Sequence, residues 1–321
     1  MKSRIRVAVV MDPIGKIQYA KDSTLAMLLG AAARGWDLYY LEMGDLMLRD
    51  GVALGHARPL TVRADPQRWY ELGPPARAPL GEFAVILMRK DPPFDTEYIY
   101  ATYILDRAAL QGALVVNHPQ GLRDMNEKVY TAWFPECCPP TLVTRQMPDM
   151  HAFLAEHGSI VCKPLYGMGG RSIFVLNAGD KNANVVFETL TDYGSRYAIV
   201  QRYLPEIVHT GDSRIILVDG EPVPFALARI PSASDNRGNL AAGATGVARP
   251  LTERDRWLAG EIGPRLAERG MIFVGLDVIG GYVTEINVTS PTGIREIDKQ
   301  CGTDIAGLLM QAIERRLASR A

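Results

Sequence analysis

The first third of the chain alternates short apolar runs with longer stretches that are apolar on one face. Residues 6–11, 38–41, 84–88 and 113–116 are short apolar runs, which is typical of buried strands. Residues 23–35 and 95–112 carry apolar side chains at helical spacing, and each follows a capping residue, Asp22 or Ser23 in one case and Asp95 or Thr96 in the other. Strands that alternate with helices favour a parallel α/β sheet.

The pattern changes twice further along. Residues 52–81 are rich in Pro, Gly and Arg and have weak periodicity, so we expect an excursion from the sheet. After His118, a helix over residues 122–133 is predicted to lead into shorter strands with hairpin signals. One such signal is Asp219-Gly220, between apolar runs at residues 215–218 and 223–230. The parallel α/β domain is therefore predicted to precede an α+β portion.

Composition narrows the class of protein. A chain of 321 residues with 47% hydrophobic side chains can bury a large core and form two or three subdomains. The 35 Lys and Arg nearly balance the 36 Asp and Glu, so we expect no nucleic acid or membrane partner. No apolar run approaches a membrane span and a strand follows the N-terminus directly, so we expect a cytoplasmic protein. Its four cysteines lack metal-like spacing, and reduced thiols are expected.

Two apolar strands near the C-terminus carry three oxygen-bearing side chains. Asp277, Glu285 and Asn287 lie on either side of Gly280-Gly281. Such groups are costly to bury among Val and Ile unless a cation offsets them. Carboxylate and amide oxygens suit Mg²⁺, so the pattern indicates a metal site; the alternative is an ordinary hairpin whose acidic residues face solvent.

The length of the connecting loop decides between these interpretations. A three-residue loop of residues 280–282 would place Asp277 opposite Glu285, with Asn287 on the same face. A two-residue turn would pair Asp277 with Thr284 and send Glu285 to the other face, because a one-residue slip inverts every side chain. The metal site therefore predicts the longer loop.

A second candidate site lies in the middle of the chain. An apolar strand over residues 159–165 precedes the glycine loop Tyr166-Gly-Met-Gly-Gly-Arg-Ser172, and an apolar run follows it. Backbone N–H groups of such a loop can surround a triphosphate, and Lys163 could supply a point charge from the strand. A plain hairpin turn is the alternative, although a lysine buried in an apolar strand needs an anionic partner. The loop is neither a Walker A motif nor a dinucleotide fingerprint.

Other basic and aromatic residues could complete a nucleotide site. Lys128 could be a second cation near the phosphates, or a solvated helix residue. The strand over residues 198–205 could hold an adenine, with Tyr203 or Leu204 covering the ring, or could be a core strand. Four arginines in the last third could bind phosphate and carboxylate groups, or lie singly on the surface: Arg214, Arg229, Arg237 and Arg295. Residues 230–246 could form a mobile lid or an inert loop.

Several longer motifs resemble one family. Met88-Arg-Lys-Asp-Pro-Pro93, Lys163-Pro-Leu-Tyr-Gly-Met-Gly-Gly170 and Thr284-Glu-Ile-Asn-Val-Thr-Ser-Pro-Thr292 are similar to motifs of the bacterial type of glutathione synthetase, within the ATP-grasp superfamily. The resemblance spans nearly the whole chain. The glycine loop is common to many ATP-grasp ligases, whereas the other two motifs are more specific. The chain departs from the family pattern at Gly243-Ala-Thr-Gly246, where a basic residue is expected.

The resemblance implies an ATP-grasp fold behind a parallel α/β N-terminal domain. It implies three parts, residues 1–122, 123–204 and 205–321, with the lid at 230–246 and ATP between the last two. It also implies a homotetramer that joins γ-glutamylcysteine to glycine, giving glutathione, ADP and phosphate through an acyl phosphate. The alternatives are another ATP-grasp carboxylate–amine ligase, or a nucleotide-binding regulatory protein without catalysis.

The resemblance also implies a role for each motif residue. ATP would be bound by Lys128, Lys163, Gly167, Gly169, Gly170, Gln201, Tyr203 and Leu204. The catalytic residues would be Arg214 and Arg237. Substrate would contact Arg89, Arg229, Ser290, Pro291 and Thr292. Magnesium, or manganese in its place, would be held by Asp277, Glu285 and Asn287.

Overall fold

The computed structural model describes residues 4–167, 172–230 and 245–320. Its N-terminal part is built on parallel strands β1 (Arg6–Val10), β2 (Asp37–Leu41), β7 (Val85–Met88) and β8 (Leu114–Val116), in the order β2-β1-β7-β8. The parallel α/β prediction is therefore confirmed. All four strands occupy the apolar runs that predicted them.

Helices α1 (Ser23–Ala33) and α2 (Thr96–Leu110) begin where the capping residues predicted. The Asp22 carboxylate accepts a hydrogen bond from the Leu25 N–H at 2.6 Å, and Asp95 accepts one from the Tyr98 N–H at 2.9 Å. Each cap satisfies one of the backbone donors that a helix start leaves without a partner. Three-residue 3-10 turns lie at Ile14–Lys16, Met43–Asp45 and Leu80–Glu82.

The expected excursion at residues 52–81 is wrong, because this segment extends the sheet. Strand β4 (Val52–Val62) pairs antiparallel with β2 and also with β3 (Leu46–Arg49), β5 (Tyr70–Leu72) and β6 (Ala76–Pro79). Several inward positions of β4 carry small residues, such as Ala53, Gly55 and Ala57. Small side chains give little hydrophobic alternation, so the period of two was not visible in the sequence.

The predicted helix over residues 122–133 is also wrong. Helix α3 (Pro119–Asp124) stops, and a 3-10 segment follows at Val129–Trp133, with another at Pro135–Cys137. The Asn126 side-chain oxygen accepts hydrogen bonds from the backbone N–H groups of Lys128, at 3.1 Å, and Val129, at 3.0 Å. An asparagine that bonds its own following backbone competes with the helix and ends it.

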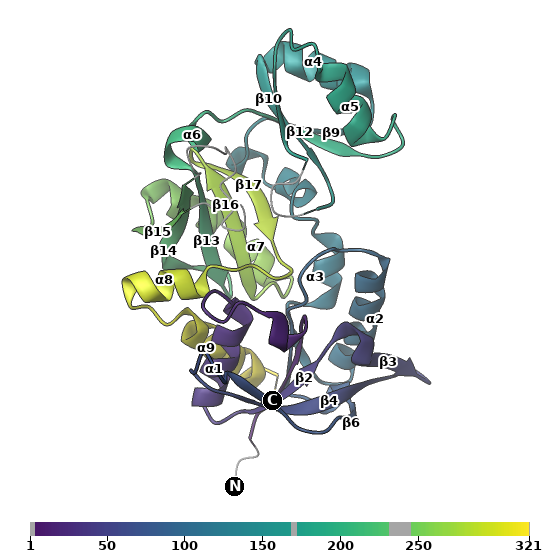
Figure 1. Cartoon of the computed structure of the whole chain (residues 1–321), viewed down its shortest axis with the longest axis vertical. Helices are drawn as coiled ribbons and strands as arrows, with labels where there is room; N and C mark the ends of the chain where they lie inside the picture. Colours follow the sequence, from purple (N-terminus) through teal and green to yellow (C-terminus); the bar gives the residue numbers. More distant parts are fainter. Residues whose placement is uncertain (1–3, 168–171, 231–244, 321) are drawn as a thin grey trace.

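A second sheet forms the upper lobe in Figure 1. Strands β9 (Thr141–Thr144), β10 (Ser159–Pro164), β11 (Phe174–Asn177) and β12 (Ala198–Arg202) are antiparallel in the order β11-β10-β12-β9, next to α4 (Met147–His157) and α5 (Ala183–Thr191). Its hydrophobic cluster, which includes Met150, Phe187 and Val200, contains only residues of this lobe. The lobe is therefore a separately packed unit.

The third sheet has the order β15-β14-β13-β16-β17. Its strands are β13 (Asp212–Val218), β14 (Glu221–Ile230), β15 (Thr245–Pro250), β16 (Phe273–Ile279) and β17 (Tyr282–Asn287), and its helices are α6 (Glu206–Thr210), α7 (Glu253–Ala267), α8 (Ile294–Cys301) and α9 (Ile305–Ala318). The predicted Asp219-Gly220 hairpin joins β13 to β14. Both remaining hydrophobic clusters mix residues of this part and of the N-terminal part, so these two parts are packed together through both clusters.

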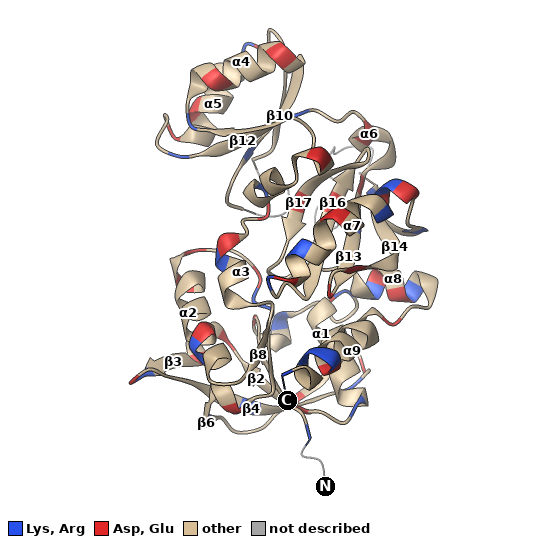
Figure 2. Cartoon of the chain, turned by 180° about the vertical axis from the view of Figure 1, so that it is seen from behind, with Lys and Arg blue, Asp and Glu red and all other residues tan. Residues whose placement is uncertain are grey.

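The distribution of charged side chains and the apolarity of the helices agree with what the composition predicted. Figure 2 shows Lys and Arg interspersed with Asp and Glu along the helices of this face. Among helices within the described ranges, none combines the length and apolarity that a bilayer crossing needs.

Two glycines of α7, Gly260 and Gly263, should respond in opposite directions when each is replaced by alanine. A Cβ at Gly263 would lie 1.9 Å from the Gly220 carbonyl oxygen, whereas one at Gly260 meets nothing within 4 Å. We expect Gly263→Ala to lower the free energy of unfolding by about 2 kcal/mol through overpacking. Gly260→Ala should raise it by roughly 0.5 kcal/mol, because alanine loses less backbone entropy. Urea denaturation measures both, and equal effects of the two variants would refute the close approach.

Candidate functional site

The β16–β17 hairpin places the predicted metal ligands, but not by the predicted loop. Its turn has two residues, Gly280 and Gly281, with φ of +54° and +79°, so the three-residue loop is wrong. A β-bulge between Asp277 and Val278 then shifts the register, and Asp277 still pairs with Glu285. The extra residue of the bulge therefore has the same effect on the register as the third loop residue that was predicted. It also leaves Thr284 without a partner across the ladder, and the Thr284 hydroxyl donates to the Asp277 carbonyl oxygen at 3.2 Å.

Asp277 lies at the centre of a buried charge cluster. The guanidinium of Arg214 donates to both its carboxylate oxygens, at 2.5 and 3.0 Å, and that of Arg229 lies 2.9 Å from one of them. Arg229 also holds Asp212 through two bonds of 2.8 and 2.6 Å. Burial alone would raise the pKa of the Asp277 carboxyl, but Arg214 and Arg229 outweigh it and hold that pKa well below its usual value. Asp277 therefore stays ionised at neutral pH.

Lys128 connects the glycine loop to the hairpin. Its ammonium donates to the Glu127 carboxylate at 2.6 Å and to the Gly167 carbonyl at 3.2 Å, and lies 3.8 Å from the Glu285 carboxylate. Burial disfavours the charge, but Glu285 and Glu127 together raise the pKa of Lys128. Lys128 is thus a buried, charged group, and its interpretation as a solvated helix residue is wrong.

Lys163 is buried without an acidic partner. Its ammonium donates to the Gln201 side-chain oxygen at 3.2 Å, and it forms no ion pair with any residue in the described ranges. Burial lowers the pKa of Lys163, although Glu285 opposes the shift. Gln201 also donates to the Thr141 hydroxyl at 3.1 Å, so its side chain orients the lysine from the neighbouring strand.

The residues expected to cover an adenine directly follow strand β12. Tyr203 follows β12 and donates its N–H to the Ser159 carbonyl, while Leu204 is buried. Arg202, next to them, lies with its guanidinium 5.6 Å from the centroid of the Tyr282 ring on β17. This cation–π contact joins the upper lobe to the hairpin.

The carboxyl edge of the N-terminal sheet contacts the turn that follows β17. Arg89 comes directly after β7 and donates to the Pro291 carbonyl at 2.9 Å and to the Thr24 hydroxyl at 3.1 Å. The Ser290 hydroxyl donates to the Arg89 carbonyl at 3.2 Å, and Arg214 donates to the Thr292 carbonyl at 3.3 Å. The structure therefore brings the expected substrate residues together beside the charge cluster.

Several predicted site residues lie outside the charge cluster or outside the described residues. Gly169, Gly170 and Arg237, most of the lid at residues 230–246, and the departure at residues 243 and 244 lie outside the described residues. Arg295 lies elsewhere, with its guanidinium 4.8 Å from the Tyr19 ring centroid. Sequence reasoning missed Asp212 and Glu127, although each stands beside a quoted basic residue in Gly211-Asp-Ser-Arg214 and Asn126-Glu-Lys128.

The donor set of the hairpin fits a divalent cation in its chemistry. Two carboxylates and one amide converge: Asp277 faces Glu285 across the strands, and the Asn287 amide lies 3.3 Å from the Asp277 carboxylate. These are the oxygen ligands that Mg²⁺ uses together with substrate phosphates. Within residues 4–167, 172–230 and 245–320 no group of three or more His, Cys, Asp and Glu could hold a metal, so this mixed set is the candidate.

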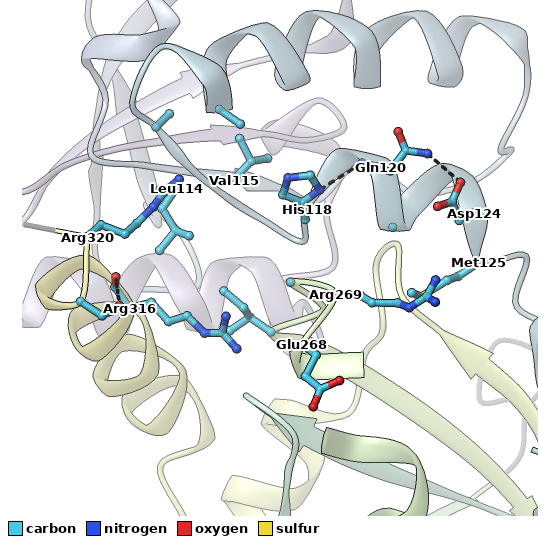
Figure 3. A pocket seen from close by; sticks show the side chains of 16 residues that line it. Leu114, Val115, His118, Gln120, Asp124, Met125, Glu268, Arg269, Arg316 and Arg320 are labelled. Carbon is cyan, nitrogen blue, oxygen red and sulfur yellow. Dashed lines mark hydrogen bonds between the residues drawn. The ribbon is translucent and has the colours of Figure 1, made fainter. Parts of the chain in front are cut away.

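A separate cavity of about 520 Å³ lies away from this cluster, where α3, the turn between α7 and β16, and the end of α9 meet (Figure 3). Its rim carries Arg269 and Arg320, both exposed, and Arg316. Arg316 is already bonded to Asp219 and to the Ala267 carbonyl. None of the predicted site residues lines it, so we do not assign the chemistry to this cavity.

Comparisons with known proteins agree with the geometry. The model of the prokaryotic glutathione synthetase N-terminal domain matches residues 5–123, and that of the prokaryotic glutathione synthetase ATP-grasp domain matches residues 127–302. The chain is 57% identical to the glutathione synthetase of Pseudomonas putida and 56% identical to that of Escherichia coli strain K12, covering 98% of this chain and 99% of each relative.

Solved structures support the fold independently of close sequence similarity. The crystal structure of the D-cycloserine synthetase DcsG superposes with a TM-score of 0.67 at 15% identity, over 97% of this chain and 99% of that one. The ATP-grasp ligase PsnB, complexed with its minimal precursor, superposes with a TM-score of 0.66 at 18% identity, over 98% and 99%. Together with the family matches, which cover more than half of the chain, they show that this chain has the ATP-grasp fold and belongs to the prokaryotic glutathione synthetase family.

Proposed function

We propose that the chain ligates γ-glutamylcysteine to glycine, using ATP and giving glutathione, ADP and phosphate. The observation that carries this proposal is a convergence of four buried cations on the acidic hairpin. Lys128, Lys163, Arg214 and Arg229 are each 7% exposed or less. Lys163 has no acidic partner among the described residues, and a polyphosphate with its metal would supply one. The activity named for the relatives in Pseudomonas putida and Escherichia coli supports the same substrates.

The chemistry requires activation of a carboxylate. At neutral pH the carboxylate and the amine are both ionised, and oxide is a poor leaving group. One oxygen of the cysteinyl carboxylate attacks the γ-phosphorus of ATP, and the bond from that phosphorus to the β–γ bridging oxygen breaks to release ADP. The glycine ammonium loses one proton, the resulting amine attacks the acyl carbon of the acyl phosphate, the bond from that carbon to the phosphate oxygen breaks, and the nitrogen loses a second proton as the amide forms.

The side chains of this chain would bind and orient rather than attack. Lys128 and Lys163 would hold the ATP phosphates, and Arg214 would face the phosphoryl group as charge develops. Asp277, Glu285 and Asn287 would hold Mg²⁺ or Mn²⁺, which when bound neutralises phosphate charge. Gly167, with Gly169 and Gly170, would contribute backbone donors, and Arg237 would contact the phosphoryl group from the lid. A closing lid would keep water from the acyl phosphate.

Arg89 is the proposed receptor for a substrate carboxylate. It is 6% exposed, and among the described residues it forms no ion pair. Burial lowers the pKa of Arg89, which is the signature of a charge without a close counterion. A peptide carboxylate would satisfy it, with Arg229 and the turn of Ser290, Pro291 and Thr292 beside it.

The sequence motifs also support proposals for the adenine site, the division of the chain and its assembly. Gln201, Tyr203 and Leu204 would line the adenine site, with Gln201 acting through Lys163. The three parts would divide at residues 122 and 204. The protein would be a cytoplasmic homotetramer.

The test is phosphate release from ATP and Mg²⁺ with γ-glutamylcysteine, with and without glycine, while the tripeptide is followed by mass. We expect release coupled one to one with glutathione. Release with another amino acid or peptide in place of these substrates would assign a different ATP-grasp ligation. Nucleotide binding without turnover for any pair would refute catalysis.

A further inference from the structure

Asn117 is a buried amide that uses its full hydrogen-bonding capacity across two domains. It is 3% exposed. Its nitrogen donates to the carbonyls of Phe273, at 2.7 Å, and Val288, at 2.6 Å. Its oxygen accepts from the N–H groups of Ile272, at 2.8 Å, and Phe273, at 2.9 Å. An amide offers two donor hydrogens and one oxygen with two lone pairs, so every site is occupied.

The position of Asn117 in the fold connects two sheets. It follows β8, the last strand of the parallel sheet, and its partners lie at the start of β16 and just beyond the end of β17. Because β16 and β17 are antiparallel, these two ends are adjacent. One side chain therefore links the N-terminal sheet to both strands of the hairpin that carries Asp277 and Glu285. The next residue strengthens the joint, since the His118 N–H donates to the Gly270 carbonyl at 3.1 Å.

Arg89 and Asn117 hold the two ends of one short segment. They follow the neighbouring parallel strands β7 and β8 and so lie at the same edge of the sheet. Asn117 bonds the carbonyl of Val288, and Arg89 bonds that of Pro291, three residues later. Phe273 connects the two clamps, because Asn117 bonds its backbone while the Arg89 guanidinium lies 5.6 Å from its ring centroid.

We propose that Asn117 is a positioning residue for the carboxylate-bearing peptide substrate. It acts through Val288 on the turn of residues 290–292 and through Phe273 on Arg89, and it does not touch substrate itself. The lysines proposed to hold the ATP phosphates, Lys128 and Lys163, make their hydrogen bonds to other residues and none to Asn117. The expected change in KM rests on the proposed function, whereas the expected loosening of the segments that Asn117 holds does not.

Asn117→Asp is the sharpest variant because it keeps the shape and both acceptor bonds. It replaces the donating nitrogen with a carboxylate oxygen facing the carbonyls of Phe273 and Val288. Two buried acceptors lose their donor and face like charge. We expect KM for γ-glutamylcysteine to rise roughly tenfold or more, the scale of one orphaned buried acceptor, while KM for ATP changes less than about twofold. Asn117→Ser, which is neutral and leaves room for a water, should show the same selectivity with a smaller change.

A readout without catalysis separates this inference from the proposed function. Hydrogen–deuterium exchange of the free protein should quicken in residues 288–293 and 272–274 in both variants. Leu154→Ala, a core cavity in α4 whose hydrophobic cluster contains only residues of the upper lobe, is the control for general destabilisation. Faster exchange in these segments, together with a rise in KM for γ-glutamylcysteine but not for ATP, supports the proposal. Unchanged exchange in those segments, exchange that quickens there equally in Leu154→Ala, or KM values for the two substrates that rise together, overturns it. If wild type forms no glutathione while the exchange pattern appears, the proposed function fails and the clamp stands.

Discussion

Replacing Asp277 with asparagine should reduce kcat/KM by roughly 10³-fold and destabilise the protein by about 3 kcal/mol. The shape is retained, but Arg214 and Arg229 lose the carboxylate to which both are bonded. Two buried guanidinium groups would then share Asp212 alone, and the candidate metal site would keep one carboxylate. Steady-state kinetics over a range of Mg²⁺ concentrations, with urea denaturation of the free protein, measures both effects.

Asp255→Asn is the matched control for this variant. Asp255 is also buried, and it pairs with Arg249 at 2.6 Å on α7. We expect it to lose similar stability but less than about threefold in activity, because no phosphate or metal role is proposed for it. If the two variants lost the same activity, the effect of Asp277 would be structural and its metal role would be refuted.

The stability effect of Asp277 should depend on pH in one direction. Its pKa in the folded protein lies below the ordinary value of 3.8, so the native state favours the ionised form. The contribution of the ionised Asp277 carboxylate to the free energy of unfolding is then fully present above pH 3.8 and is lost as the pH falls further. The difference in unfolding free energy between wild type and Asp277→Asn should be constant from pH 5 to 8 and shrink below pH 4.

An element of the fold could be predicted from the sequence only where a recognisable sequence signal encodes it. Asp22 and Asp95 predicted helix starts because capping is local and uses one residue type. The large side chains of β1 and β7 predicted the parallel sheet. Strand β4 was missed because small residues such as Ala53 and Gly55 occupy inward positions, and a pattern of large apolar side chains is absent there.

The hairpin shows a different limit. The facing pair Asp277 and Glu285 was predicted correctly, but from a loop of the wrong length. A two-residue turn with a bulge and a three-residue loop place this pair alike, and the sequence Gly280-Gly281-Tyr282 permits both. Asn117 is a third case, since the three residues that accept or donate its four hydrogen bonds lie at least 155 residues away and no spacing rule connects them. Contacts of that separation exist only once the sheets are packed.

Replacing Lys163 with methionine should stabilise the free protein while it abolishes efficient use of ATP. Among the described residues Lys163 has one hydrogen bond, to Gln201, and no acidic partner. The net effect of its surroundings on the charged form is unfavourable, because burial lowers its pKa despite Glu285. A lost neutral-acceptor bond costs about 1 kcal/mol, whereas a buried ion without a partner costs several. The cost of the buried ion is larger than that of the lost bond, so we expect the free energy of unfolding to rise by about 1 kcal/mol or more. We expect kcat/KM for ATP to fall roughly 10²-fold.

The sign of the stability change should reverse when nucleotide is present. Without ATP, Lys163→Met should melt roughly 2 °C above wild type. With saturating ATP and Mg²⁺ the wild type should melt higher, because phosphate binding stabilises only the protein that retains the cation. Lys181→Met, at an exposed lysine of the same lobe, should change neither value. Without ATP, the advantage of the variant should also fade as the pH rises toward 10.5, where the native lysine is neutral and its burial no longer costs free energy. If the variant melted lower in both conditions, Lys163 would be a structural residue whose charge is already satisfied, and the phosphate role proposed for it would be wrong.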